Sequence, residues 1–313
     1  MARSASVALV AALLIATGAA FAYTERLKLT PSPILGTSVT KVFSPVCECA
    51  SDVAVIAFRL RKADRVDVEM IDAEDRVVRR LVIDGPRRAG RVVVVWDGRD
   101  EAGAVVEEGS YRPRVRLDRQ RRTITLPNPI RVDVTPPTVE RFSVTPRVFS
   151  PDGDFRRDSV VARYAVSEPA EVSLYVDGAR EVRKRGRREE GRIRWFGTLD
   201  GKAAPAGVYR LQVGATDVAG NVAQRSRPAA VVVRYVALGR ERIPAVAGRS
   251  FAVLVVSDAA RVRWRFDGRT GTMRPGTLRL RAPDESGRYP LVVAANGRAD
   301  RAIVVVRAPA EAS

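Results

Sequence analysis

A block of residues near the start of the chain recurs about a hundred residues later. Phe43-Ser44-Pro45 is followed by Asp52, and Phe149-Ser150-Pro151 is followed by Asp158, so in both copies the Asp lies nine positions after the Phe. The same offset of 106 aligns three further pairs, Phe58 with Tyr164, Val66 with Val172 and Val68 with Leu174. An internal period of this length predicts tandem copies of one small module.

The second half of the repeat combines a tryptophan with a later tyrosine. Trp96-Asp97-Gly98 runs to Gly109-Ser110-Tyr111, and Trp195-Phe196-Gly197 runs to Gly207-Val208-Tyr209. A Trp at the end of a core strand supplies a large apolar area that holds two sheets together. We expect each Tyr hydroxyl to bond a loop carbonyl, as tyrosine corners do. The predicted structural motif is therefore Trp96, Asp97, Gly98, Gly109 and Tyr111 in the first copy, with Trp195, Gly207 and Tyr209 in the second.

The apolar residues follow the spacing of strands rather than of helices. In Arg65–Ile71 they alternate with polar residues, which places them on one face. The valine run 91–96 predicts a strand buried on both sides or in the core of a sandwich, and the turn formers of 97–103 predict a hairpin loop. Because Pro136 and Pro137 cannot lie inside a central strand, the chain leaves the sheet there.

These patterns predict an all-β fold of tandem β-sandwiches after an N-terminal hydrophobic leader helix. The expected organisation is a leader over residues 1–23, a linker over 24–35, a first module over 36–134, a second over 135–234, a third and smaller module over 235–308, and a tail over 309–313.

Composition narrows the chemistry that the chain can perform. The chain has no histidine, which removes Ser-His-Asp and Cys-His nucleophiles, imidazole zinc sites and the commonest general base. Pairs of carboxylates could still act as catalysts, but no feature of the sequence indicates a cleft that would hold such a pair. We therefore expect no catalytic residue, no bound cofactor and no enzymatic activity.

The formal net charge of +18 comes mainly from arginine, since only five of the basic residues are lysines. A GC-rich genome that places Arg on solvated faces accounts for most positions. The alternative is attraction to an anionic partner. Arg112, Arg114 and Arg116 share one face of a strand, where they either bind a polyanion or protect an edge; a solvated face is favoured. Aromatic residues are not interleaved with this basic stripe, so it lacks the stacking platforms of single-stranded nucleic-acid sites.

The N-terminus indicates export. Arg3 precedes an uncharged run from Val7 to Ala22, and Ala20-Phe21-Ala22 offers the small residues that a signal peptidase reads. The charged residues after Tyr23 equally suit an uncleaved membrane anchor. Cleavage is slightly favoured over anchoring, and in both cases the remainder lies outside the cytoplasmic membrane. Nucleic acid is for this reason not an expected partner.

Cys47 and Cys49 are the only thiols in the chain. In an oxidising compartment an even number of cysteines predicts a disulfide. The competing interpretation is a soft-metal site, but two thiolates are too few ligands for a closed one. A disulfide is favoured.

Asp152, Asp154 and Asp158 surround a glycine turn in the second copy. Carboxylates at alternate positions can converge on a hard cation such as calcium. The bidentate Glu of an EF-hand is missing, and Phe155 stands where a small residue is commoner. The alternative, which we favour, is an acidic turn whose Asp side chains bond local amides.

The two repeats resemble the immunoglobulin-like (Ig-like) module of the FlgD (flagellar hook-capping) type. The resemblance rests on Phe-Ser-Pro with its acidic turn, the run Trp96–Gly103 and the later Gly-x-Tyr, and it covers about residues 36–234. The second copy departs from the pattern at Phe196, where Asp is usual. The resemblance implies Ig-like or fibronectin-III-like sandwiches in a bacterial surface protein. A hook cap would also need a flagellar-binding N-terminal region, in whose place this chain has a leader.

Two functions are compatible with these features. The first is an exported, membrane-tethered or secreted, non-enzymatic scaffold or binding module at the bacterial cell envelope, whose partner is an envelope protein or an anionic surface polymer. The second is a set of accessory modules of a surface enzyme whose catalytic part lies on another chain. The absence of histidine and of a nucleophile motif favours the first.

Overall fold

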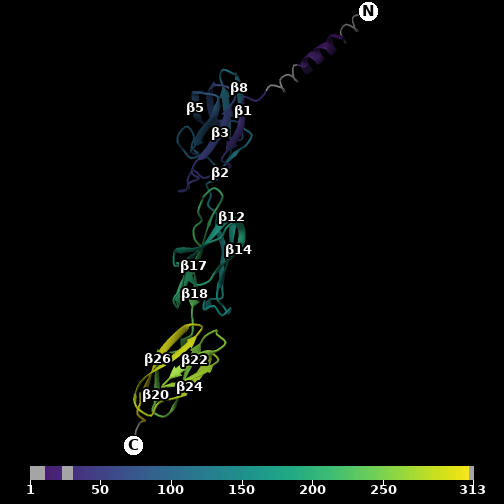
Figure 1. The fold of residues 1–313 in the computed structure, drawn as a ribbon. Coiled ribbons are helices and arrows are strands. Elements are labelled where there is room, and N and C mark those ends of the chain that lie inside the picture. Colours follow the sequence, from purple (N-terminus) through teal and green to yellow (C-terminus); the bar gives the residue numbers. More distant parts are fainter. Residues whose placement is uncertain (1–10, 23–30, 310–313) are drawn as a thin grey trace, which may run out of the picture. The chain divides into compact units, whose positions relative to one another are not determined.

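The computed structural model describes residues 11–22 and 31–309. Residues 11–22 form a helix, and the remainder consists of strands, turns and bends (Figure 1). The predicted all-β fold is thus confirmed. The first ten residues and the end of the expected leader, Tyr23, lie outside the described residues. The chain divides into two compact units, 1–134 and 135–313, each of which is considered by itself.

The first unit is a sandwich of two sheets. One sheet has the order β1-β3-β6 and is antiparallel; the other has the order β2-β9-β7-β4-β5, with β8 paired to β7. The strands are β1 (Ile34–Val39), β2 (Val42–Phe43), β3 (Ala54–Leu60), β4 (Asp64–Ile71), β5 (Val77–Arg87), β6 (Gly90–Trp96), β7 (Gly109–Leu117), β8 (Arg122–Thr125) and β9 (Ile130–Val132).

Alternation of side chains along these strands builds the core between the sheets. In β4 the side chains of Val66, Val68 and Met70 are fully buried. The valine run behaves in the same way, because Val92 and Val94 are buried while Val93 is 51% exposed. Burial of β6 on both sides is therefore wrong: this sheet is covered on one face only.

The loop after Trp96 contains the expected tight turn, closed by an antiparallel bridge between Arg99 and Val105, but it does not pair the two strands on either side of it. β6 belongs to the three-stranded sheet and β7 to the larger one, so residues 97–108 cross from one sheet to the other. Turn formers indicate that the chain reverses, but they do not indicate which strand it joins next.

The second module, in the second unit, has the same two-sheet arrangement as the first. One long strand, however, takes the place of the two strands β3 and β4. β12 (Val160–Val176) is long enough to serve both sheets: its first half pairs with β10 and β14, and its second half with β13 and β17. β17 continues to β18, which pairs in parallel with β11. The other strands are β10 (Val139–Thr145), β11 (Val148–Phe149), β13 (Ala179–Arg183), β14 (Arg188–Trp195), β17 (Gly207–Thr216) and β18 (Ala229–Val233), with the small ribbon β15 (Thr198–Leu199) and β16 (Lys202–Ala203).

The third module repeats the arrangement of the first. A sheet β19-β21-β24 faces a sheet β20-β26-β25-β22-β23, and β20 and β26 are parallel, as β2 and β9 are. The strands are β19 (Ala237–Leu238), β20 (Arg242–Val246), β21 (Ser250–Val256), β22 (Val262–Phe266), β23 (Arg269–Met273), β24 (Gly276–Arg281), β25 (Gly287–Ala295) and β26 (Arg298–Arg307). It has its own hydrophobic core.

In the first module, Trp96 on one sheet lies between Phe43 and Tyr111 of the other, with ring centroids 5.6 and 5.2 Å away in edge-on geometry. The indole Nε1 donates to the carbonyl of Arg99 at 3.1 Å. The Tyr111 hydroxyl donates to the carbonyl of Glu107 at 2.8 Å. The aromatic lock, as we name this arrangement, therefore fixes the loop as well as the two sheets.

The second module builds the same lock from Phe149, Trp195 and Tyr209. The centroid distances are 5.4 and 5.5 Å. The indole of Trp195 donates to Thr198 at 2.8 Å, and the Tyr209 hydroxyl donates to Pro205 at 2.9 Å. In both modules the tyrosine bonds the carbonyl four residues before it, as a tyrosine corner does.

Replacing Trp96 or Trp195 by Ala is expected to lower the free energy of unfolding of its own module by about 3–5 kcal/mol, because the change leaves a cavity between the sheets. Chemical denaturation of the full chain, followed by circular dichroism, measures this change. Val95→Ala is the matched control, since its side chain is 52% exposed on the strand of Trp96. An unchanged unfolding midpoint for either Trp variant would show that the two positions are not equivalent core positions.

Candidate functional site

The basic stripe expected on β7 is compensated by acidic side chains. The Nη2 atom of Arg114 lies 2.6 Å from Oε2 of Glu69 on the neighbouring strand β4. Arg116 is 3.9 Å from Asp67, and Arg112 is 3.5 Å from Asp75. Each ion pair on such a surface is worth at most about 1 kcal/mol, but together they cancel the local positive charge. We therefore do not regard Arg112, Arg114 and Arg116 as an anion site.

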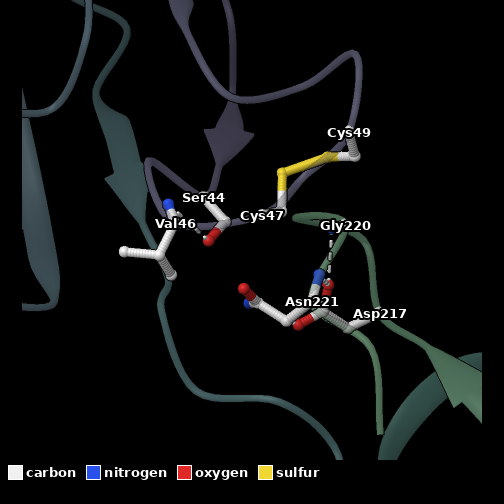
Figure 2. The surroundings of a disulfide bond; sticks show 7 residues. All are labelled: Ser44, Val46, Cys47, Cys49, Asp217, Gly220 and Asn221. Atoms are coloured by element: carbon white, nitrogen blue, oxygen red, sulfur yellow. Dashed lines mark hydrogen bonds between the residues drawn. A yellow bond between two sulfur atoms is a disulfide. The ribbon is translucent and has the colours of Figure 1, made fainter.

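Cys47 and Cys49 form a disulfide in the turn between β2 and β3, with their Cα atoms 5.2 Å apart (Figure 2). The turn begins at Ser44, whose side chain is buried. Its carbonyl accepts a hydrogen bond from the amide of Cys47 at 3.4 Å, and its hydroxyl oxygen accepts one from Val46. The bridge thus closes the turn that follows Phe43 of the aromatic lock.

The matching turn of the second module is organised by Asp158. Its Oδ1 atom accepts the amides of Asp152 and Gly153 at 3.1 and 2.9 Å, and its Oδ2 atom accepts the amide of Phe155 at 2.7 Å. A carboxylate that satisfies three main-chain donors has a structural role in the turn.

Asp152 and Asp154 lie next to a third carboxylate that the sequence did not indicate. Oxygen atoms of Asp152, Asp154 and Asp258 lie within 4.8 Å of one another, and Asp258 follows β21 in the third module. Burial, and then the charges of Asp152 and Asp154, raise the pKa of Asp258. Among the described residues, Oδ1 of Asp152 and Oδ1 of Asp258 are buried and accept no hydrogen bond. Sequence reasoning missed Asp258 because it is about a hundred residues away in the chain.

A second basic group surrounds a cavity of about 540 Å³ on the second module. Its cationic lining comes from neighbouring strands and the segment before β14: Arg141, Arg163, Lys184, Arg188 and Arg192. Tyr164 and Gly191 also line it. Strand β14 thus supplies part of this lining. No sequence motif marked this set, because it forms only when β12 pairs with β14.

No helix among the described residues is both long and apolar enough to cross a bilayer.

The comparisons with known proteins agree with the architecture of the first module. Residues 50–120 match the family model described as the FlgD Ig-like domain. Among curated proteins, no relative matches the sequence.

Solved structures similar to the chain include titin Ig domains and bacterial adhesin domains. A variant of titin domains I67–I69 is 11% identical, with 90% of this chain and 100% of that chain covered and a TM-score of 0.33. A bacterial ice-binding adhesin is 13% identical, with 89% and 99% covered and a TM-score of 0.29. A tetra-tandem repeat of a large adhesion protein is 14% identical, with 86% and 73% covered and a TM-score of 0.26. The family match confirms, for residues 50–120, the resemblance to the FlgD Ig-like domain.

Proposed function

We propose that this chain is an exported, non-enzymatic repeat protein that acts as a structural or binding module at the bacterial cell envelope. The proposal rests on one observation: the residues repeated in the two modules are buried or bonded to the main chain. Trp96 and Trp195 are buried, and the hydroxyl groups of Tyr111 and Tyr209 are bonded to loop carbonyls. The repeated residues therefore hold sheets together and present no reactive group to a substrate.

Export is proposed from the leader sequence and the cysteine pair. An uncharged run before a small-residue site is the pattern of a signal peptide, and a disulfide persists in oxidising compartments. The partner would be an envelope protein or an anionic surface polymer, and the N-terminal segment would add contact with the membrane where it is not cleaved. Nucleic acid is not a proposed partner.

For the acidic turn we propose a structural role, with calcium at Asp152, Asp154 and Asp158 as the alternative. The bonds from Asp158 to three amides support the structural role. A cation would have to compete with these amides for the same two oxygen atoms.

Export is tested in a bacterial host that produces the full chain. We expect the protein to be accessible to protease added to spheroplasts, and its intact mass to show a Cys47–Cys49 bridge that only reductant opens to alkylation. Cleavage after Ala22 would give an N-terminus at Tyr23, and an uncleaved chain would remain with the membrane. A variant without Val7–Ala22 is the control and should stay inside the cell. Protease protection in spheroplasts, or free thiols in the protein outside the membrane, would contradict the proposal.

The role of Asp158 is tested by Asp158→Ala in the full chain, in the presence of a calcium chelator. We expect the free energy of unfolding to fall by about 1–3 kcal/mol, because three amide donors of the turn, one of them half-buried, lose their charged acceptor. Asp154→Ala is the matched control, since its carboxylate accepts one amide, that of Arg156; a smaller loss is expected there.

Calcium titration separates the two interpretations of the turn. The structural role predicts no heat of binding and an unchanged melting temperature at millimolar calcium. Calcium binding that disappears in Asp158→Ala would instead establish the cation site.

A further inference from the structure

We propose that the second module binds phosphate groups carried on a saccharide or polyol, in the cavity lined by Tyr164 and the arginines of β12 and β14. The inference concerns the isolated protein and does not depend on where in the cell the chain resides. Figure 1 shows β12 beside β14, which brings the residues of this site together.

The first argument is unpaired positive charge. Among the described residues, the guanidinium groups of Arg163, Arg188 and Arg192 make no ion pair and no hydrogen bond, in contrast to the paired arginines of β7. Glu190 is the acidic residue of the lining, and it lies 3.9 Å from Arg141. Several guanidinium groups around one hollow present the planar donor forks that bind phosphate oxygens in pairs.

The second argument is a tyrosine hydroxyl that lines the cavity and bonds no side chain or carbonyl around it. Tyr164 is only 5% exposed, and its hydroxyl makes no hydrogen bond with any described residue. A Cβ atom at Gly191 would lie 2.7 Å from that hydroxyl and 3.0 Å from Nζ of Lys184. Because Gly191 has no side chain, the hydroxyl and the ammonium group share the space above it. A ligand oxygen in the cavity would supply the bond that Tyr164 lacks.

The third argument comes from the first module, which has the same frame without these groups. Phe58 stands at the position of Tyr164, and its cross-strand partner is Val92, where the second module has Gly191. Ala57 and Val93 form the next pair, where the second module has Arg163 and Arg192. The sandwich therefore forms without the hydroxyl, the glycine or the two arginines. They are additions to the second module rather than requirements of the fold.

The lining favours a phosphorylated saccharide or polyol over a nucleic acid. Tyr164 is the aromatic residue of the lining, and its ring is packed in the core, so the site has no exposed ring on which a base could stack. The hydroxyls of Tyr164 and Ser143 can instead donate to and accept from the hydroxyl groups of a sugar or polyol.

The proposal is tested by calorimetric titration of the full chain with inositol hexakisphosphate at fixed salt concentration. We expect saturable binding at one site, weakened at least about tenfold by Arg163→Gln combined with Arg192→Gln, since tenfold corresponds to the loss of one strong charged contact. The matched control is Arg263→Gln combined with Arg265→Gln, which removes the same charge from exposed arginines of β22. The control should change the Kd less than about threefold, because exposed charges that do not line the cavity are largely screened by salt.

Tyr164→Phe tests the hydroxyl without disturbing the core, because Phe occupies the equivalent position of the first module. We expect an unchanged melting temperature and binding about three- to tenfold weaker. Unchanged binding would show that the hydroxyl does not contact the ligand, and would overturn its assignment to the site.

Three results would overturn the proposal itself. They are no saturable binding, equal weakening by both arginine pairs, and equal or tighter binding of a single-stranded oligonucleotide through Arg163 and Arg192. The second result would mean attraction by net charge alone, and the third a nucleic-acid site. Hexametaphosphate, which carries six phosphates on no polyol, is titrated in parallel: weaker binding than that of the hexakisphosphate supports recognition of the carrier, and equal binding would contradict it.

Discussion

One tryptophan placed between two aromatic rings of the opposite sheet holds each of the first two modules together. Phe43 and Tyr111 flank Trp96, and Phe149 and Tyr209 flank Trp195, in edge-on geometry that favours aromatic pairs by about 0.5–1.5 kcal/mol beyond the area buried. The lock also explains why the two halves of the repeat occur together. Gly98 has a φ of +71°, and a Cβ there would lie 2.7 Å from Pro45, so the Phe-Ser-Pro and Trp-x-Gly segments are in direct contact.

The third module shows how much of this arrangement the sandwich requires. It keeps the strand order of the first module, and Tyr289 still donates to the carbonyl four residues before it, that of Glu285. It has no tryptophan in the lock. Phe251 of one sheet contacts Phe266 of the other at 5.3 Å, and Phe266 is fully buried. Burial of aromatic area between the sheets is thus the common requirement, and tryptophan is one way to meet it.

Strand patterns and repeated motifs predicted the parts of the molecule that depend on local sequence. Alternation identified the buried faces of strands such as β4, and the Gly-x-Tyr step predicted the hydroxyl-to-carbonyl bond. The sequence did not predict which sheet the strand after the Trp96 loop joins, because turn residues indicate a reversal of the chain but not the pairing of the strand that follows. The basic stripe also needed the structure, since Glu69 and Asp67 neutralise it only through the register of β4 against β7. The same holds for the cavity lined by Arg163 and Arg192, and for the carboxylates of Asp152 and Asp258. In both cases only folding brings the residues together.

Hydrogen exchange of the indole N–H groups tests the aromatic lock most directly. The N–H groups of Trp96 and Trp195 donate to the carbonyls of Arg99 and Thr198 inside the lock, whereas Trp264 of the third module is half-buried. If the locks hold the sheets together, both N–H groups should exchange only on global unfolding of their own module, with the free energy that denaturation gives for that module. Exchange of either N–H as fast as that of Trp264, with the module still folded, would contradict the account.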